Sequence, residues 1–470
     1  MKLKFSFTFM CILALHSCQD APAPGVQDTS PDDAAPIEDA YSDQVSYRDI
    51  NKAIAAITSS GDFGMERSRA SMYSVDSLIS KDGVLTALVV NFANDGGFIL
   101  LSPQKTFYPV MAYSDKGHFD VNVEGKPVEE WTEDMSDVIS QLDYLPSDSI
   151  EIYRRMWNDL LFESSINSIS TNAVSRAEGE VSQEEYQQLI QIARAKRTEF
   201  EQKGYKTFSL EEVFKNDPEG YESIIQEATA AIFPIYDHLV LALSFAVEIN
   251  NSNNYTKQNL LQTSWNQTGG FNQSFHFISD SQRAYAGCGP VAMGQIMKYY
   301  QYPPSYPWTK MHNSYGTKET SDFLYELAIR AHASFKSEGT KTSVENMQST
   351  LESYGYICER DVYSLSRTLS DINSNKPVLM TGKEEKYHAW VSSGFNICNG
   401  TQYYDFYTMT HHYSMGNFSR SNVYSFSSTS LYMNWGWGGA YDGYYVETSN
   451  IVLPNGKYTK DRINIYINKP

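Results

Sequence analysis

Apolar and polar residues show two different periodicities in the first half of the 470-residue chain. Residues 84–102 hold two apolar runs on either side of Asn-Asp-Gly-Gly, a pattern that predicts a β-hairpin. A helix is expected from Tyr47 onward, and residues 127–250 repeat their apolar positions mostly at helical spacing. The apolar run His238–Ile249 is too short to cross a membrane and is predicted to be a buried helix.

The stretch Asn250–Asn259 is polar and has no periodicity. It predicts an exposed, unstructured junction between two parts of the chain. Residues 250–470 contain 18 Lys+Arg and 16 Asp+Glu, whereas the preceding residues contain 19 and 40. This break in charge indicates two units with different roles. The net charge of −19 argues against nucleic acid as a partner.

Cys288 lies between two glycines and is followed by a proline and an amphipathic run. Val291, Gln295 and Tyr299 recur at helical spacing, so a helix is expected to begin near Cys288 and to stop before Pro303. The N–H groups and the positive dipole end at a helix N-terminus favour a thiolate. The position therefore predicts a nucleophile, and the plainer alternative is a small buried residue.

Three further segments supply partners that a thiolate nucleophile needs. His388 lies in the second strand of a predicted strand–turn–strand unit and is the candidate base. Asn434 is expected to accept the other ring N–H of that histidine, with Trp435 and Trp437 shielding the bond from water. Gln267 is expected to join the Cys288 backbone N–H in an oxyanion hole. The plain alternatives are a satisfied strand histidine and an aromatic-rich turn.

The N-terminus predicts export. Residues 1–17 have lysines, a short apolar core and a small residue before Cys18, which resembles a bacterial lipoprotein signal. Lipidation at Cys18 is favoured over an ordinary secretory signal, because an acidic Pro/Ala-rich tether follows over residues 18–45. The expected location is the outer membrane or cell surface, with the lipid as the membrane anchor and release possible after processing.

Cysteine number leaves one question open. Cys11 leaves with the signal, so Cys288, Cys358 and Cys398 remain in the exported domains. An odd number leaves at least one thiol without a disulfide. Cys358 and Cys398 either form a disulfide or are two buried thiols. A metal site at His411-His412 is not expected, because no Cys, Asp or Glu lies at a convincing spacing.

Together these segments resemble the streptopain family of papain-like cysteine peptidases over residues 258–470, and residues 84–120 resemble the propeptide and inhibitor (Spi-like) module of Bacteroidetes-type members. The matching motifs in this chain are Gly287-Cys288, Gln295-Ile296-Met297-Lys298-Tyr299, Tyr302-Pro303, His388-Ala389-Trp390-Val391, Asn434-Trp435-Gly436-Trp437-Gly438-Gly439 and Asp442-Gly443. The long interval between the histidine and asparagine motifs is expected to be an inserted loop beside the cleft.

The resemblance implies an α+β architecture in which the helix bearing the cysteine packs on an antiparallel sheet. It implies a propeptide over 46–250, with an inhibitory module at about 50–125 and a helical region at about 127–250, followed by the catalytic domain at 251–470. It also implies a zymogen that hydrolyses protein substrates through a Cys288–His388 ion pair and a thioester, with no cofactor and with its own propeptide as inhibitor.

Three other functions remain open. A bacteriocin-leader type peptidase has a similar cysteine motif but is normally fused to a transporter. A Cys-His acyl-transfer enzyme would share the same residue types, and an amine acceptor would distinguish it from a hydrolase. A non-enzymatic surface lipoprotein could bind a protease or host protein through residues 50–125, although the presence of Cys288, His388 and Asn434 argues against it.

Overall fold

The computed structural model describes residues 43–60, 73–126, 128–162, 183–214, 224–228, 242–337, 339–382, 388–409, 414–421, 423–447 and 462–470. Asp43–Pro470 form one compact unit. The predictions for the signal and the lipidated cysteine concern residues outside the described ranges. Among the described helices, none has the length and apolar character needed to cross a membrane.

The N-terminal module combines a four-stranded antiparallel meander with three helices. Its elements are α1 (Tyr47–Ser60), β1 (Tyr73–Ile79), β2 (Leu85–Phe92), β3 (Phe98–Leu101), β4 (Val110–Ser114), α2 (Glu129–Ile139) and α3 (Ser147–Phe162). The predicted hairpin is confirmed as β2 and β3. Its turn needs left-handed backbone at Asn94 and Asp95, and a Cβ at Gly97 would lie 2.2 Å from the Ser114 carbonyl oxygen.

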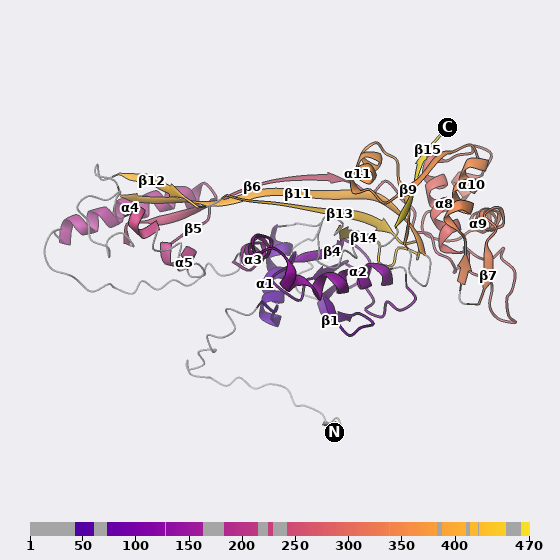
Figure 1. The fold of residues 1–470 in the computed structure, drawn as a ribbon, viewed down its shortest axis with the longest axis horizontal. Coiled ribbons are helices and arrows are strands. Elements are labelled where there is room, and N and C mark those ends of the chain that lie inside the picture. Colours follow the sequence, from indigo (N-terminus) through magenta and orange to yellow (C-terminus); the bar gives the residue numbers. More distant parts are fainter. Residues whose placement is uncertain are drawn as a thin grey trace, which may run out of the picture. The chain divides into compact units, whose positions relative to one another are not determined.

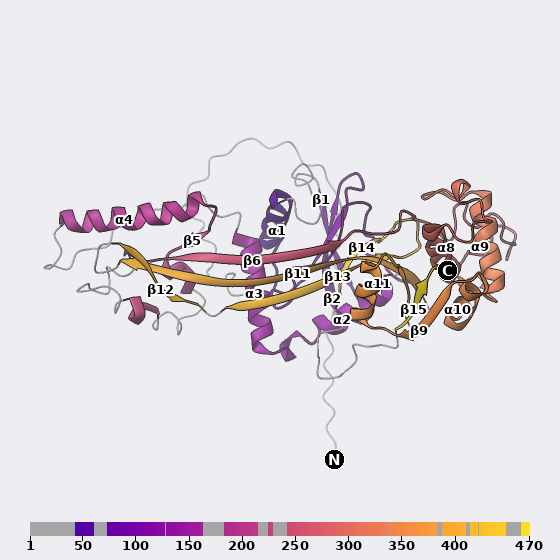
Figure 2. The ribbon, with the colours of Figure 1, turned by 90° about the horizontal axis from the view of Figure 1, so that it is seen from above.

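The C-terminal region, which contains Cys288, packs helices on antiparallel strands. Its helices are α8 (Cys288–Tyr300), α9 (Lys318–Arg330), α10 (Val344–Ser353) and α11 (Leu365–Asn373). Its strands are β9 (Ile357–Val362), β10 (Val378–Gly382), β11 (His388–Met409), β13 (Tyr424–Asn434), β14 (Gly443–Val446) and β15 (Ile463–Asn468), with a small hairpin of β7 (Ser334–Lys336) and β8 (Gly339–Lys341). Figure 2 shows α8, α9 and α10 together beside β9 and β15. The predicted α+β class and the cysteine-bearing helix are confirmed.

One buried cluster explains why α8 lies where it does. Its apolar side chains, including Val291 and Ile296, pack with Leu379, Val391 and Ile465 of the sheet. All five are essentially inaccessible to solvent. This core holds the start of α8 against β11.

A third part of the structure corrects two predictions. Its elements are α4 (Gln183–Gln202), β5 (Thr207–Phe208), α5 (Leu210–Phe214), β6 (Phe245–Lys257) and β12 (Met415–Arg420). The helix predicted up to Ile249 is wrong from Phe245 onward, and the junction predicted at Asn250–Asn259 is mostly strand rather than unstructured. As Figure 1 shows, β6, β11 and β13 run side by side.

The physical reason for both errors is a distant partner. Every residue of β6 pairs with β11, from Phe245 opposite Tyr407 to Lys257 opposite Phe395. The side chains of Asn251–Thr256 are exposed, so no apolar alternation marks the strand. For the same reason the insertion after His388 is not the expected loop: β11, β12 and β13 occupy most of its described residues.

The N-terminal module and the C-terminal region share one sheet. Strand β4 pairs with β14, Tyr113 lying opposite Tyr444 and Ala112 opposite Tyr445. The rings of Tyr113 and Tyr444 stack with centroids 5.1 Å apart. The module is therefore joined to the segment that directly follows the tryptophan-rich turn.

Candidate active site

Cys288 is the first residue of α8, as the sequence predicted. Gly287 has φ 90°, and a Cβ there would lie 2.9 Å from the Thr340 side chain, so the turn into the helix requires glycine. Burial raises the pKa of the Cys288 thiol above its usual 9.0, while backbone N–H groups of Ala389, Gly289 and Cys288 itself lower it. The Cys288 sulfur therefore lies against Ala389 of β11, the residue that directly follows His388.

His388 begins β11, opposite Gly382 of β10. Burial lowers the pKa of its imidazole to about 4, and a hydrogen bond to the Trp435 backbone acts in the opposite direction. Its Nε2 is buried and has no hydrogen-bond partner among the described residues. A charged imidazolium would carry a proton on that atom, so the charged form would bury an unsatisfied donor.

The ion pair expected between Cys288 and His388 remains a prediction. Desolvation raises the pKa of the Cys288 thiol and lowers that of the His388 imidazole, and in both cases it favours the uncharged form. The structure therefore places both groups where burial disfavours their charged forms.

The expected hydrogen bond from His388 to the Asn434 side chain is corrected. The imidazole bonds instead to the backbone of the next residue, Trp435. Asn434 is 1% exposed; its Oδ1 accepts from Gln295 Nε2 at 2.9 Å and from the Gly436 N–H at 3.2 Å. The partner of His388 thus lies in the predicted segment, but it is the Trp435 backbone rather than the Asn434 side chain.

Gln267 lies close to the start of α8. Its carbonyl accepts the backbone N–H of Ala286 at 2.9 Å, and its own N–H donates to Asn266 Oδ1 at 2.7 Å. Gln267 is half-buried. A role for that side chain as oxyanion donor remains a prediction.

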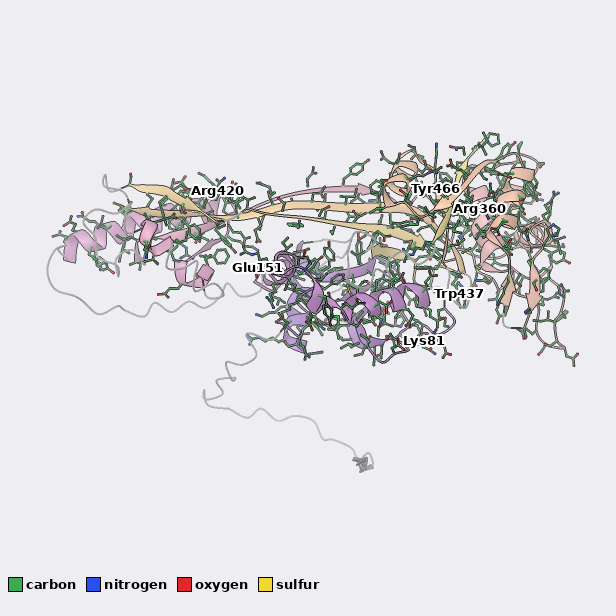
Figure 3. All side chains as sticks on the ribbon, in the orientation of Figure 1. Lys81, Glu151, Arg360, Arg420, Trp437 and Tyr466 are labelled. Carbon is green, nitrogen blue, oxygen red and sulfur yellow. The ribbon has the colours of Figure 1, made fainter. Side chains whose placement is uncertain are left out.

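The two tryptophans have different surroundings. Trp435 is 2% exposed, and its ring lies 6.4 Å from His388 and 5.1 Å from Trp390, as expected of a residue that keeps water from the imidazole. Trp437, labelled in Figure 3, lies on the turn between β13 and β14. The ammonium of Lys126, from the N-terminal module, lies 5.5 Å from the centre of its ring.

The N-terminal module also reaches the histidine strand pair, which sequence reasoning missed. Glu130, in the first turn of α2, lies against Gly382: a Cβ there would meet the Glu130 carboxylate. Asp134 of the same helix pairs with Arg462 at 2.6 Å, and both side chains are only 14% exposed. Since Gly382 is paired with His388, α2 covers the edge of the candidate site.

The remaining cysteine and metal predictions can be checked in part. Cys358 and Cys398 are separate thiols, so the open question of a disulfide between them is answered in the negative. No cluster of metal-ligating side chains occurs within the described ranges. His411-His412 lie outside those ranges.

Two family models match parts of the chain. Residues 265–319 match the Peptidase C10 family, and residues 41–139 match the Spi protease inhibitor. No curated protein matches the chain.

Two solved structures from Prevotella intermedia are similar. A fragment of a prointerpain A mutant has 14% identity and a TM-score of 0.45, covering 85% of this chain and 100% of that one. Active wild-type interpain A cysteine protease has 17% identity and a TM-score of 0.32, covering 45% of this chain and 94% of that one.

The first match contains Cys288, and the second contains β4, which pairs with β14, and α2, whose Glu130 lies against Gly382. The chain therefore carries, around Cys288, a segment of the Peptidase C10 (streptopain) type of cysteine peptidase, and ahead of it a Spi-like inhibitor module.

Proposed function

We propose that the chain is the zymogen of an exported cysteine endopeptidase, with Cys288 as nucleophile and His388 as the acid–base partner. The observation that carries this assignment is the contact between the Cys288 sulfur, at the start of α8, and the Ala389 N–H, next to His388. This contact joins a helix N-terminus to the candidate base.

The proposed reaction follows from these groups. His388 takes the thiol proton, and the sulfur forms a bond to the peptide carbonyl carbon. The Gln267 side chain and the Cys288 N–H hold the developing oxyanion. His388 then returns the proton to the nitrogen as the C–N bond breaks. Water adds to the thioester, releasing the acid and restoring the thiol.

Latency is proposed to come from the N-terminal module. Its helix α2 covers the strand pair that carries His388, and burial keeps both reacting groups neutral. Removal of the module would admit water and substrate, so that the imidazolium and thiolate can form together. Cys18 is proposed as the lipid anchor of the exported chain.

The test compares wild type with Cys288→Ala. The wild-type chain is expected to shorten itself and then to hydrolyse casein, whereas the variant stays full length and inactive while retaining its circular dichroism spectrum. Casein hydrolysis by Cys288→Ala would refute the assignment of Cys288 as the nucleophile. Transfer to an added amine in place of hydrolysis would instead favour the acyl-transfer alternative.

A further inference from the structure

Gln295 is completely buried on α8, at a position that the reaction above does not use. It follows Cys288 by seven residues, nearly two helical turns, so both side chains face the same side of the helix. Its Oε1 accepts the backbone N–H of Trp265 at 3.2 Å, and its Nε2 donates to Asn434 Oδ1 at 2.9 Å. One buried amide thus connects three separate segments of the site.

The hydrogen bonds form a closed ring. Asn434 Nδ2 donates to the Thr263 carbonyl at 2.7 Å, which returns the chain of bonds to the segment that contains Trp265. The orientation of both amides is determined, because the Trp265 N–H can only donate and the Thr263 carbonyl can only accept. The contact between the amides must then run from Gln295 Nε2 to Asn434 Oδ1.

Two segments of this ring, around Trp265 and around Asn434, are connected to the groups proposed to react. Gln267 lies two residues beyond Trp265, and its backbone is tied to Ala286 ahead of Cys288. On the other side, Trp435 follows Asn434 directly, and its backbone holds the His388 ring. A shift of the ring would move the oxyanion donor and the histidine acceptor relative to the sulfur.

We propose that Gln295 and Asn434 are positioning residues that keep Gln267 and the Trp435 carbonyl in register with Cys288. This inference rests on the proposed function of the same site. Loss of the ring is expected to lower kcat by about 100-fold, comparable to the loss of one oxyanion donor, with KM changed less than about threefold.

Two substitutions at Gln295 separate positioning from folding. Gln295→Met removes both hydrogen bonds at similar volume. Gln295→Glu keeps the acceptor for Trp265, but when ionised it cannot donate to Asn434. Protonation restores a donor, so kcat of this variant is expected to recover as the pH falls from about 8 to about 5, relative to wild type. A purely structural role would lower the unfolding midpoint without this pH dependence.

The experiment measures kcat and KM on a peptide substrate for the processed wild type, Gln295→Met, Gln295→Glu, Asn434→Leu and the double variant Gln295→Met/Asn434→Leu. If the amides act as one unit, the double variant loses no more than about threefold beyond the larger single loss. Gln348→Met, which changes a half-buried amide on α10 that donates to Glu352, is the control. A Gln295→Met enzyme with kcat within about threefold of wild type would overturn the inference, as would a Gln295→Glu loss that does not vary with pH. An inactive wild type would refute the proposed function instead.

A second inference comes from the packing of α4 and β6. Phe200 of α4 lies 4.8 Å from Tyr407 of β11, ring centre to ring centre, and Phe245 of β6 stacks on the same tyrosine at 5.6 Å. Phe208 packs in a cluster with Phe406, which has no solvent exposure. The described residues of 183–257 therefore share their core with the insertion after His388, and we call these two segments the ribbon lobe.

We infer that the ribbon lobe stays with the mature enzyme, so that activation removes the chain ahead of Gln183. A cut near the expected junction at 250–259 would interrupt β6 and separate it from β11 over part of their paired length. It would also uncover the aromatic cluster around Tyr407. The retained chain is then about 290 residues, Gln183 to Pro470, whereas a cut at 250–259 would leave roughly 210–220.

The test needs no activity of the enzyme itself, so it is independent of the proposed function. Full-length Cys288→Ala protein is digested with added proteases, and the surviving fragments are sized and sequenced. A resistant fragment that begins near Gln183 supports the inference; one that begins beyond Lys257 and remains folded overturns it. For the self-processed wild type, an N-terminus near Gln183 likewise supports the inference, and one beyond Lys257 overturns it.

A matched pair on α4 tests the packing. Leu189 is 2% exposed in a cluster with Met409, whereas Ile192 on the same helix is 36% exposed. In the Cys288→Ala background, Leu189→Ala is expected to raise the rate of cutting within residues 183–257 by about tenfold, because local opening exposes the segment. Ile192→Ala should stay within about twofold of the parent. Equal rates for the two variants would refute the lobe's role in retaining this segment.

Discussion

The reactivity of Cys288 towards iodoacetamide should change sharply when the N-terminal module is removed. In the full-length chain, burial holds the pKa of the thiol above 9.0 and that of the His388 imidazole at about 4. At pH 6 the raised pKa keeps the thiol protonated, and about one imidazole in 100 is charged. Alkylation requires the thiolate, so the full-length protein is expected to react slowly.

Removal of the module hydrates the site and lets the imidazolium pair with the thiolate, which lowers the pKa of the thiol. The alkylation rate of Cys288 at pH 6 is therefore expected to rise by at least about 100-fold, and the gain should be absent in His388→Ala. The assay is peptide mass spectrometry after timed alkylation between pH 4 and pH 9. Cys358 is an internal control, because burial raises the pKa of its thiol to about 12 and it should stay slow in both forms.

Equal alkylation rates of Cys288 at pH 6 before and after processing would refute this reasoning. That result would mean that burial under the module does not set the charge state of the pair. A gain that persists in His388→Ala would show instead that the helix N-terminus and the backbone N–H groups lower the thiol pKa without the histidine.

Burial raises the pKa of Asp442 to about 7, so the stability that its protonated form contributes is lost as the pH rises from about 4 towards 7. Asp442→Asn, in the Cys288→Ala background, should flatten the pH dependence of the unfolding midpoint between pH 4 and pH 7. An unchanged pH dependence would contradict the raised pKa of Asp442. Asp134→Asn breaks the buried pair with Arg462, which keeps Glu447 at 3.8 Å, and should weaken inhibition by the released module about 30-fold, or about 2 kcal/mol. An unchanged inhibition constant would count against that contact. Cys18→Ala should release the protein from the membrane fraction, and unchanged fractionation would indicate another anchor.

Local patterns were sufficient for the elements that carry the chemistry. The glycine-flanked start of α8 and the strand–turn–strand unit around His388 have signals within a few residues of each other, because helix starts and hairpins are formed by near neighbours in sequence. The segment around Asn434 was expected to contact His388, and the structure places the Trp435 backbone against the imidazole. The group that makes this contact was not predicted correctly, because an amide and a neighbouring backbone carbonyl are equivalent acceptors until the chain is packed.

The sequence by itself thus determined the candidate reacting residues, their order along the chain and the α+β class. The tertiary structure alone decided which groups meet: Gln295 contacts Asn434 across 139 residues, and β6 is a strand only because β11 lies beside it. It also decided the burial that raises the pKa of Cys288 and lowers that of His388, since desolvation depends on what covers a group rather than on its sequence neighbours. Hydrogen bonding and burial between distant segments leave no local pattern, whereas helix starts and turns do.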